Sequence, residues 1–125
     1  MNLKSDLFNF LKAQGLMPED RDYGIFFRYQ MLNFLVIIDE DDDQFLRLAL
    51  PGIFDVDENN RADVLEACNR TCHRMKVSKC YVPKDDVWVA AEQLLDSDPN
   101  YEDIVPRLLN ILMQSRDAFY EEIRQ

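Results

Sequence analysis

Residues 22–54, DYGIFFRYQMLNFLVIIDEDDDQFLRLALPGIF, decide the fold of this chain, because they hold three strand patterns separated by short turns. In Asp22–Gln30, apolar side chains recur at every second position, which is the period of a β-strand. Leu32–Asp39 is apolar on both sides, which favours a central strand. The third run is Gln44–Leu50, extended toward Phe54 past a Pro-Gly pair that predicts a bulge or an edge. Strands joined by such short links are antiparallel neighbours.

Helical patterns flank this stretch on both sides. A first helix, capped by Ser5 or Asp6, is expected to end before Gly15, where a C-terminal glycine belongs. The later patterns predict a helix over 59–76, strands over 77–82 and 87–95, and a closing helix over 101–124. The order is therefore α-β-β-β-α-β-β-α. It predicts an α+β fold, a single antiparallel five-stranded sheet with helices packed on it, in one domain over residues 1–125.

The acidic composition limits the classes of partner. The chain has 24 Asp and Glu against 14 Lys and Arg, a net charge of −10. Nucleic acids and anionic membranes both attract Lys/Arg patches, so we expect neither as a partner. No run approaches the roughly 20 apolar residues of a membrane span, and the N-terminal segment does not resemble a signal peptide. Three cysteines give no disulfide framework. We expect a cytoplasmic protein with free thiols.

Catalytic motifs are missing from the sequence. Nucleophilic catalysis needs a base beside a Ser or Cys, but His73 is the only histidine and no Gly-x-Ser-x-Gly motif occurs. The three glycines cannot form a Gly-rich phosphate-binding loop. We therefore expect no enzyme and no cofactor.

The acidic segment 55–66 offers an alternative function as a calcium-binding regulatory protein. Counting from Asp55, positions 1, 3, 5 and 12 are occupied by Asp55, Asp57, Asn59 and Glu66, as in an EF-hand loop. Asn60 takes the place of the glycine at position 6, and Asn tolerates a left-handed conformation. However, a strand precedes the loop where an EF-hand has a helix. The simpler interpretation is an acidic helix N-terminus whose side chains cap free amides, so we predict no metal.

The helix over 59–76 carries two of the three cysteines. Its expected buried face holds Leu65, Cys68, Asn69, Cys72 and Met75. An unpaired amide there would cost about 1 to 3 kcal/mol, so Asn69 is expected to bond a backbone group. Buried free thiols behave as small apolar side chains, and we interpret the cysteines as core residues rather than zinc ligands.

The aromatic residues point to a binding surface. The first strand carries aromatic side chains on both faces, and further ones lie on the neighbouring strands. If helices cover only one face of the sheet, the other keeps a larger apolar area than monomers usually expose. A second covering helix is the alternative. We select Phe26, Tyr29, Phe34 and Trp88 as candidate residues for binding a protein partner or a second copy of the chain.

Several segments together resemble the YbjN-like family, whose members are often called regulators of bacterial sensory transduction. The likeness is carried by Leu7, Phe10, Leu11 and Gly15, by Phe26-Phe27-Arg28-Tyr29, by Asp57-Glu58-Asn59-Asn60 leading to Leu65 and Asn69, by Lys79-Cys80-Tyr81-Val82, and by the closing helix. The resemblance implies a type III secretion chaperone-like fold in a dimeric bacterial domain of the cytosol, without established catalytic residues.

The sequence therefore predicts a non-enzymatic protein-interaction module, chaperone-like or regulatory. It would bind a segment of a partner protein, or a second copy of itself, through an apolar surface of the sheet or the helices. Acidic residues around that surface would affect the rate of association with the partner. An acidic decoy that covers a basic enzyme surface is a third class that the composition leaves open.

Overall fold

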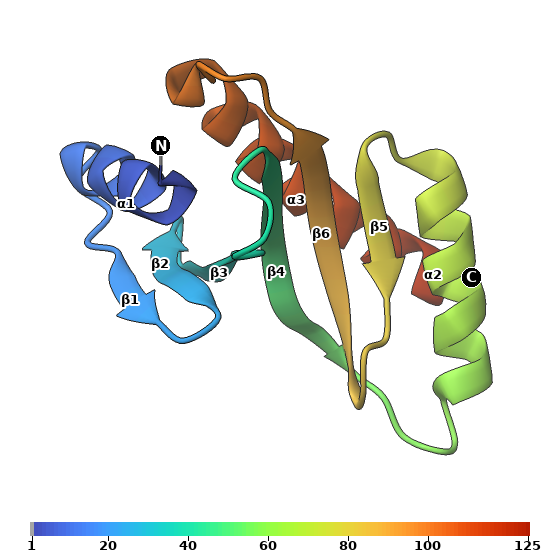
Figure 1. Cartoon of the computed structure of the whole chain (residues 1–125). Helices are drawn as coiled ribbons and strands as arrows, with labels where there is room; N and C mark the ends of the chain where they lie inside the picture. The colour runs from blue at the N-terminus through green and yellow to red at the C-terminus, as the bar shows by residue number, and fades with distance from the viewer. Residues whose placement is uncertain (1) are drawn as a thin grey trace.

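The computed structural model describes residues 2–125, which form three helices and six strands (Figure 1). In chain order these are α1 (Leu3–Ala13), β1 (Glu19–Arg21), β2 (Gly24–Tyr29), β3 (Leu32–Ile37), β4 (Phe45–Asp55), α2 (Arg61–Arg74), β5 (Ser78–Tyr81), β6 (Asp86–Leu94) and α3 (Tyr101–Ile123). The first helix begins earlier than expected, because Asn2 rather than Ser5 or Asp6 is its cap: the Asn2 side chain accepts a hydrogen bond from the backbone of Ser5. Gly15 follows the helix at φ +79°, as predicted.

All strands belong to one open antiparallel sheet in the order β1-β2-β3-β4-β6-β5. The α+β prediction is confirmed, but the sheet has six strands rather than five. The strand that the sequence did not reveal is β1, whose three residues are all charged and exposed. It forms because the chain after α1 returns along β2, with Glu19 opposite Phe26. A strand without apolar alternation gives no pattern to find.

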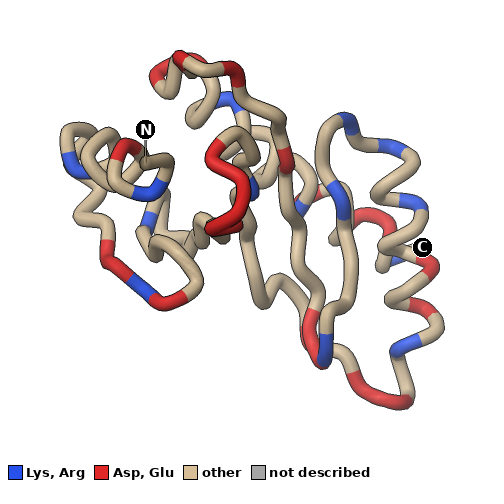
Figure 2. Tube along the Cα trace, viewed as in Figure 1, with Lys and Arg blue, Asp and Glu red and all other residues tan. Residues whose placement is uncertain are grey.

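The turn between β2 and β3 falls where the sequence placed it. Tyr29 faces Leu32, so Gln30 and Met31 form a two-residue loop. Both have positive φ, 50° and 66°, as a type I′ hairpin turn requires. The loop between β3 and β4 carries the five acidic residues 39–43, which form a red segment of the tube in Figure 2. All five are exposed, as so many clustered carboxylates require.

The helices all pack on one face of the sheet. Along each long strand, alternate residues point into a single hydrophobic core with the apolar stripes of α1, α2 and α3. Figure 1 shows α3 running behind β4, β6 and β5, and no helix of the described chain lies in front of these strands. The sheet contributes to this core Ile25, Phe27, Phe34, Val36, Leu46, Leu48, Leu50, Cys80, Val87, Val89 and Ala91.

The buried face of α2 differs from the predicted one. Its core residues are Val64, Ala67, Cys68 and Thr71, whereas Asn69 is exposed and Leu65 is 48% exposed. The helix lies against both β5 and α3, and Arg70 and Arg74 both bind Glu122 of α3. Contact with α3 turns the buried stripe by about one residue, 100° around the helix axis, so Asn69 does not need the backbone partner we expected.

Candidate functional site

The sheet face away from the helices carries a row of residues in register. Phe26 lies opposite Leu35, Leu35 opposite Ala49, Ala49 opposite Ala90, and Ala90 opposite Lys79. Residues paired in this way point to the same side of a sheet, so the row crosses five strands on one face. We call this face, with its flanking side chains, the open face. Its larger members are Phe26, Leu35, Ile37, Phe45, Arg47, Lys79, Tyr81, Trp88, Glu92 and Leu94.

Basic side chains lie over three aromatic rings of the open face. The distances from the charged group to the ring centroid are 5.3 Å for Arg21 over Phe26 and 5.2 Å for Arg47 over Phe45. Lys79 lies 5.2 Å from the ring centroid of Tyr81. Contacts of this kind contribute roughly 0.5 to 1 kcal/mol each at exposed sites. They place a positive charge over each of these rings.

One carboxylate links two of these cations. Glu92 accepts a hydrogen bond from Arg47 at 2.6 Å and forms an ion pair with Lys79 at 3.2 Å. Burial alone would raise the pKa of Glu92, but the bonds from Arg47 and Lys79 outweigh it and lower the pKa below its usual value. Glu92 is therefore ionised at neutral pH, and it neutralises only one of the two cations.

Trp88 is held in a fixed orientation at the end of the open face nearest the β5–β6 turn. Its indole Nε1–H points at the carboxylate of Asp86, 3.1 Å from each oxygen, and its ring lies 6.4 Å from that of Tyr81. The ring is partly exposed. It thus presents apolar area to solvent with its polar group already bonded, an arrangement suited to an interface.

The structure separates the four residues that the sequence selected. Phe26 and Trp88 are partly exposed on the open face, on strands β2 and β6, about 14 Å apart across the sheet by the usual strand spacing. Tyr29 and Phe34 point to the opposite, helix-covered face. Phe34 is 0% exposed and stacks on Phe27 with 5.7 Å between ring centroids, so it is a core residue and provides no binding surface. Tyr29 packs against the same core and its ring lies 6.4 Å from Phe34.

The sequence analysis missed several members of the open face, among them Tyr81, Phe45 and the cations that lie over them. The alternation of side chains along each strand is the signal from which these residues could be identified. Residues at even steps from Phe26 and Trp88, followed through the antiparallel register, all share one face. That register was not known before the strands were paired.

The acidic segment 55–66 is organised as a helix entrance. The Asp57 carboxylate accepts hydrogen bonds from the backbone of Asn59 and Asn60, and the Asn60 side chain binds the backbone of Asp57 and Asp55. Asn60 has φ −107°, so it does not take the left-handed conformation expected at position 6 of an EF-hand. Within residues 2–125 no group of three or more His, Cys, Asp or Glu side chains is arranged to hold a metal ion. These bonds form a turn that leads into α2, and Asn60, the N-cap residue, makes no side-chain hydrogen bond to the helix, so the predicted capping of its amides is not observed. The conformation of Asn60 does not favour the calcium alternative.

The three cysteines meet where α2 crosses β5. The Sγ atoms of Cys68 and Cys80 are 3.5 Å apart, and the Cys72 Sγ accepts a hydrogen bond from the backbone N–H of Cys80 at 3.1 Å. Cys68 and Cys80 are buried, and Cys72 is partly exposed. All three are free thiols. They fill the helix–strand contact as small side chains, in agreement with their interpretation as core residues.

Together these observations define a class of protein: a one-sided antiparallel sheet whose uncovered face combines aromatic and basic side chains. Among solved structures, the fold is similar to the crystal structure of YbjN from E. coli, described as "a putative transcription regulator", with a TM-score of 0.73 and 9% sequence identity over 94% of this chain and 88% of that one. It is also similar to the crystal structure of an uncharacterized protein from Methanothermobacter thermautotrophicus, with a TM-score of 0.66 and 12% identity over 98% and 96% of the two chains.

The chain therefore has a YbjN-like fold, as the resemblance in its sequence predicted. No protein-family model matches the chain, and no curated protein matches it in sequence. At these identities the likeness concerns the fold alone. None of the helices within residues 2–125 has both the length and the apolar character needed to cross a membrane.

Proposed function

We propose that this chain is a non-enzymatic regulatory or chaperone-like module that binds a segment of a partner protein on its open face. The observation that carries the proposal is the one-sided sheet. Three helices cover one face, and the other carries a row of residues in register across five strands. The central members of this row, Ala49 and Ala90, are buried, and partly exposed aromatic, aliphatic and charged side chains surround them. Apolar surface of this kind, rimmed by charge, is typical of interaction sites.

The residue types on the open face favour strong contacts. Trp, Tyr and Arg dominate the energetics of protein interfaces, and the open face has Trp88, Tyr81 and Arg47. Their side chains are already ordered by the hydrogen bond to Asp86, the bond to Glu92 and the cation contacts. Binding would therefore cost little further side-chain entropy. The description of YbjN as a regulator is compatible with this role.

The test is a partner titration with matched variants. Proteins captured on the immobilised chain would be identified, purified and titrated by calorimetry against wild type, Trp88→Ala and Leu65→Ala. Leu65 is an exposed apolar residue on α2, away from the open face, so its variant controls for loss of apolar surface in general. We expect Trp88→Ala to weaken binding at least about tenfold and Leu65→Ala to leave it unchanged.

Equal affinities for wild type and Trp88→Ala, with circular dichroism showing both folded, would contradict the proposal. Light scattering on the chain alone addresses the second possible occupant, another copy of itself. A dimer that Trp88→Ala converts to a monomer would assign the open face to self-association instead of a partner.

A further inference from the structure

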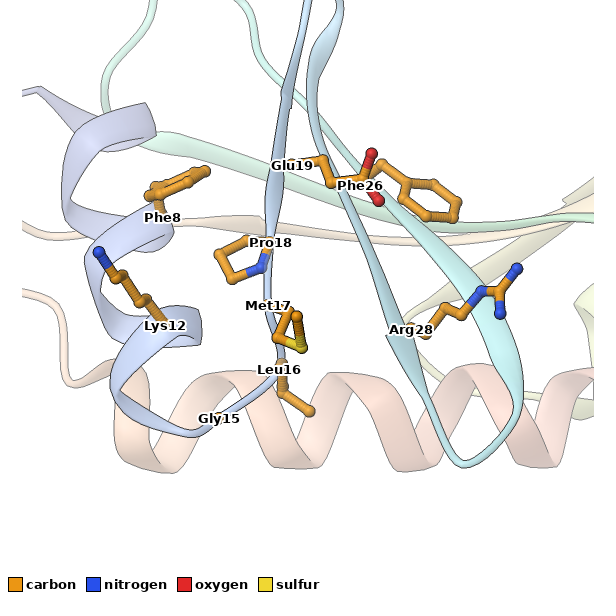
Figure 3. Close-up of a pocket in the computed structure, with 9 residues that line it drawn as sticks. All are labelled: Phe8, Lys12, Gly15, Leu16, Met17, Pro18, Glu19, Phe26 and Arg28. Carbon is orange, nitrogen blue, oxygen red and sulfur yellow. The ribbon is translucent and has the colours of Figure 1, made fainter.

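A groove lies at the edge of the sheet, between α1 and strands β1 and β2 (Figure 3). Its volume is about 900 Å³. Phe8 and Lys12 line it from α1, Phe26 and Arg28 from β2, and the segment Leu16–Pro18 passes between them. A second hollow of about 230 Å³ shares Phe8 and continues along α1 to Lys4 and Asp20. The groove is thus elongated and open, and its apolar floor adjoins the open face at Phe26.

The groove is formed by ordered backbone. After α1, the N–H of Gly15 binds the carbonyl oxygen of Lys12 at 3.0 Å and that of Leu16 binds Leu11 at 3.1 Å. Met17 then takes φ +49° and leaves its side chain 83% exposed at the rim. A methionine is flexible and polarizable, so its side chain can adapt to different apolar neighbours. A preformed groove with one adaptable rim residue favours binding of a flexible ligand.

The cations of the groove have no acidic partners. Nine of the 14 Lys and Arg side chains form ion pairs within residues 2–125; the others are Lys12, Arg28, Lys76, Lys84 and Arg124. Two of these five, Lys12 and Arg28, line the groove. Arg28 donates only its Nε–H, to Asn33 at 3.1 Å. The carboxylate of Glu19 is paired with Arg21 at 2.7 Å, and that of Asp20 in the adjoining hollow is paired with Lys4.

Lys12 and Arg28 thus lie beside apolar side chains without a carboxylate partner, in a chain of net charge −10. Their complement is a ligand that combines carboxylates with apolar groups. The second hollow continues the groove along α1, which favours a peptide segment over a compact ligand. Pairing of that peptide with the edge of β1 is disfavoured, because all three residues of β1 are charged and Lys4 donates to the carbonyl oxygen of Arg21 at 3.0 Å.

We propose that this groove binds an acidic segment of the partner protein, which crosses Leu16–Pro18 with carboxylates at Lys12 and Arg28 and with separate apolar side chains against Phe8 and Phe26. The proposal rests on the proposed function and adds the chemistry of the partner. The open face provides apolar area, and the groove selects the sign of charge of the segment that continues from it.

The experiment uses the full chain and a library of random 12-residue peptides displayed on phage. We expect selection on wild type to enrich peptides in which Asp or Glu flank Leu, Ile or Phe. One enriched peptide would then be synthesised with a fluorescent label and its affinity measured by anisotropy. The test variant is Lys12→Glu with Arg28→Glu, and the control is Lys76→Glu with Lys84→Glu. Both variants change the net charge equally at exposed side chains without ion pairs.

We expect the groove variant to weaken peptide binding at least about tenfold and the control to change it less than about twofold. Raising sodium chloride from about 50 to 500 mM should weaken binding to wild type. Peptides without acidic enrichment, or equal losses in both variants, would overturn the proposal.

The outcome is separable from that of the proposed function, because Trp88 does not line the groove. A partner that depends on Trp88 but not on Lys12 and Arg28 refutes the groove alone. A partner that depends on neither refutes both.

Discussion

Replacing Gly24 with alanine is expected to destabilise the fold strongly, because an added side chain would clash with the backbone of the neighbouring strand β3. It has φ +147°, and a Cβ atom added there would lie 2.1 Å from the carbonyl oxygen of Val36. Gly24 pairs with Arg21 of β1 on one side and with Ile37 of β3 on the other. The strands would have to separate by about 1 Å to restore an ordinary contact, which would weaken the pairing on both sides.

The magnitude follows from these contacts. Two or three ladder hydrogen bonds at about 1 kcal/mol each, with about 1 kcal/mol of backbone strain, give a loss of roughly 3 to 4 kcal/mol. Gly15→Ala is the matched control, since Gly15 also has positive φ, +79°, but nothing lies within 4 Å of its added Cβ. It should cost about 1 kcal/mol.

Equilibrium unfolding in urea, followed by Trp88 fluorescence and far-ultraviolet circular dichroism, measures both variants. The Gly24→Ala midpoint should fall by roughly 2 M relative to wild type, and the Gly15→Ala midpoint by much less. If the two variants differed by less than about 1 kcal/mol, the clash with Val36 would not be the cause, and the reasoning would be wrong.

Three further predictions concern buried polar groups and thiols. Ser115 is fully buried, donates to the carbonyl oxygen of Ile111 at 2.8 Å and lies 2.7 Å from the Ser78 hydroxyl. Ser115→Ala should therefore cost about 1 kcal/mol and Ser78→Ala less, and the reverse order in urea unfolding would contradict this. The folded-state pKa of Glu92 is lowered, so the stability that it provides is present above its unfolded pKa of about 4.3 and is lost as the pH falls through the folded value. Glu92→Gln should reduce the difference in urea midpoint between pH 7 and pH 3, and an undiminished difference would assign that pH dependence to other groups. Cys68 and Cys80 are buried and Cys72 is partly exposed, and the hydrogen bond with Cys68 and burial also raise the pKa of Cys80. Iodoacetamide should therefore modify Cys72 first in the native protein, and mass spectrometry showing early modification of Cys80 would count against the packing described.

The sequence patterns located most elements within a few residues, because strand and helix periods are local properties of the chain. The patterns gave the wrong result where contact with a neighbouring strand or helix determined the structure. The strand β1 has three charged residues and forms only because β2 offers it an edge. The buried stripe of α2 was placed about one residue away from the observed one, because contact with α3 as well as β5 set its orientation.

The candidate site was predicted in part. Phe26 and Trp88 were selected from the sequence and lie on the open face, while Phe34 was selected and is buried against Phe27. Aromatic character alone could not distinguish them, since β2 and β3 carry apolar residues on both faces. The groove at Lys12 and Arg28 could not be predicted, because it depends on the path of residues 15–18 between α1 and β2, which the helix and strand patterns do not specify.

The amino-acid sequence by itself determined that this chain forms an antiparallel α+β domain with an acidic surface. Alternation, helical spacing and turn residues act over a few positions, and net charge is a sum that needs no fold. Only the tertiary structure decided which face of the sheet the helices cover, which aromatic rings stay exposed, and which cations are left without carboxylates. Those properties depend on side chains brought together from distant positions, so strand register and helix docking determine them.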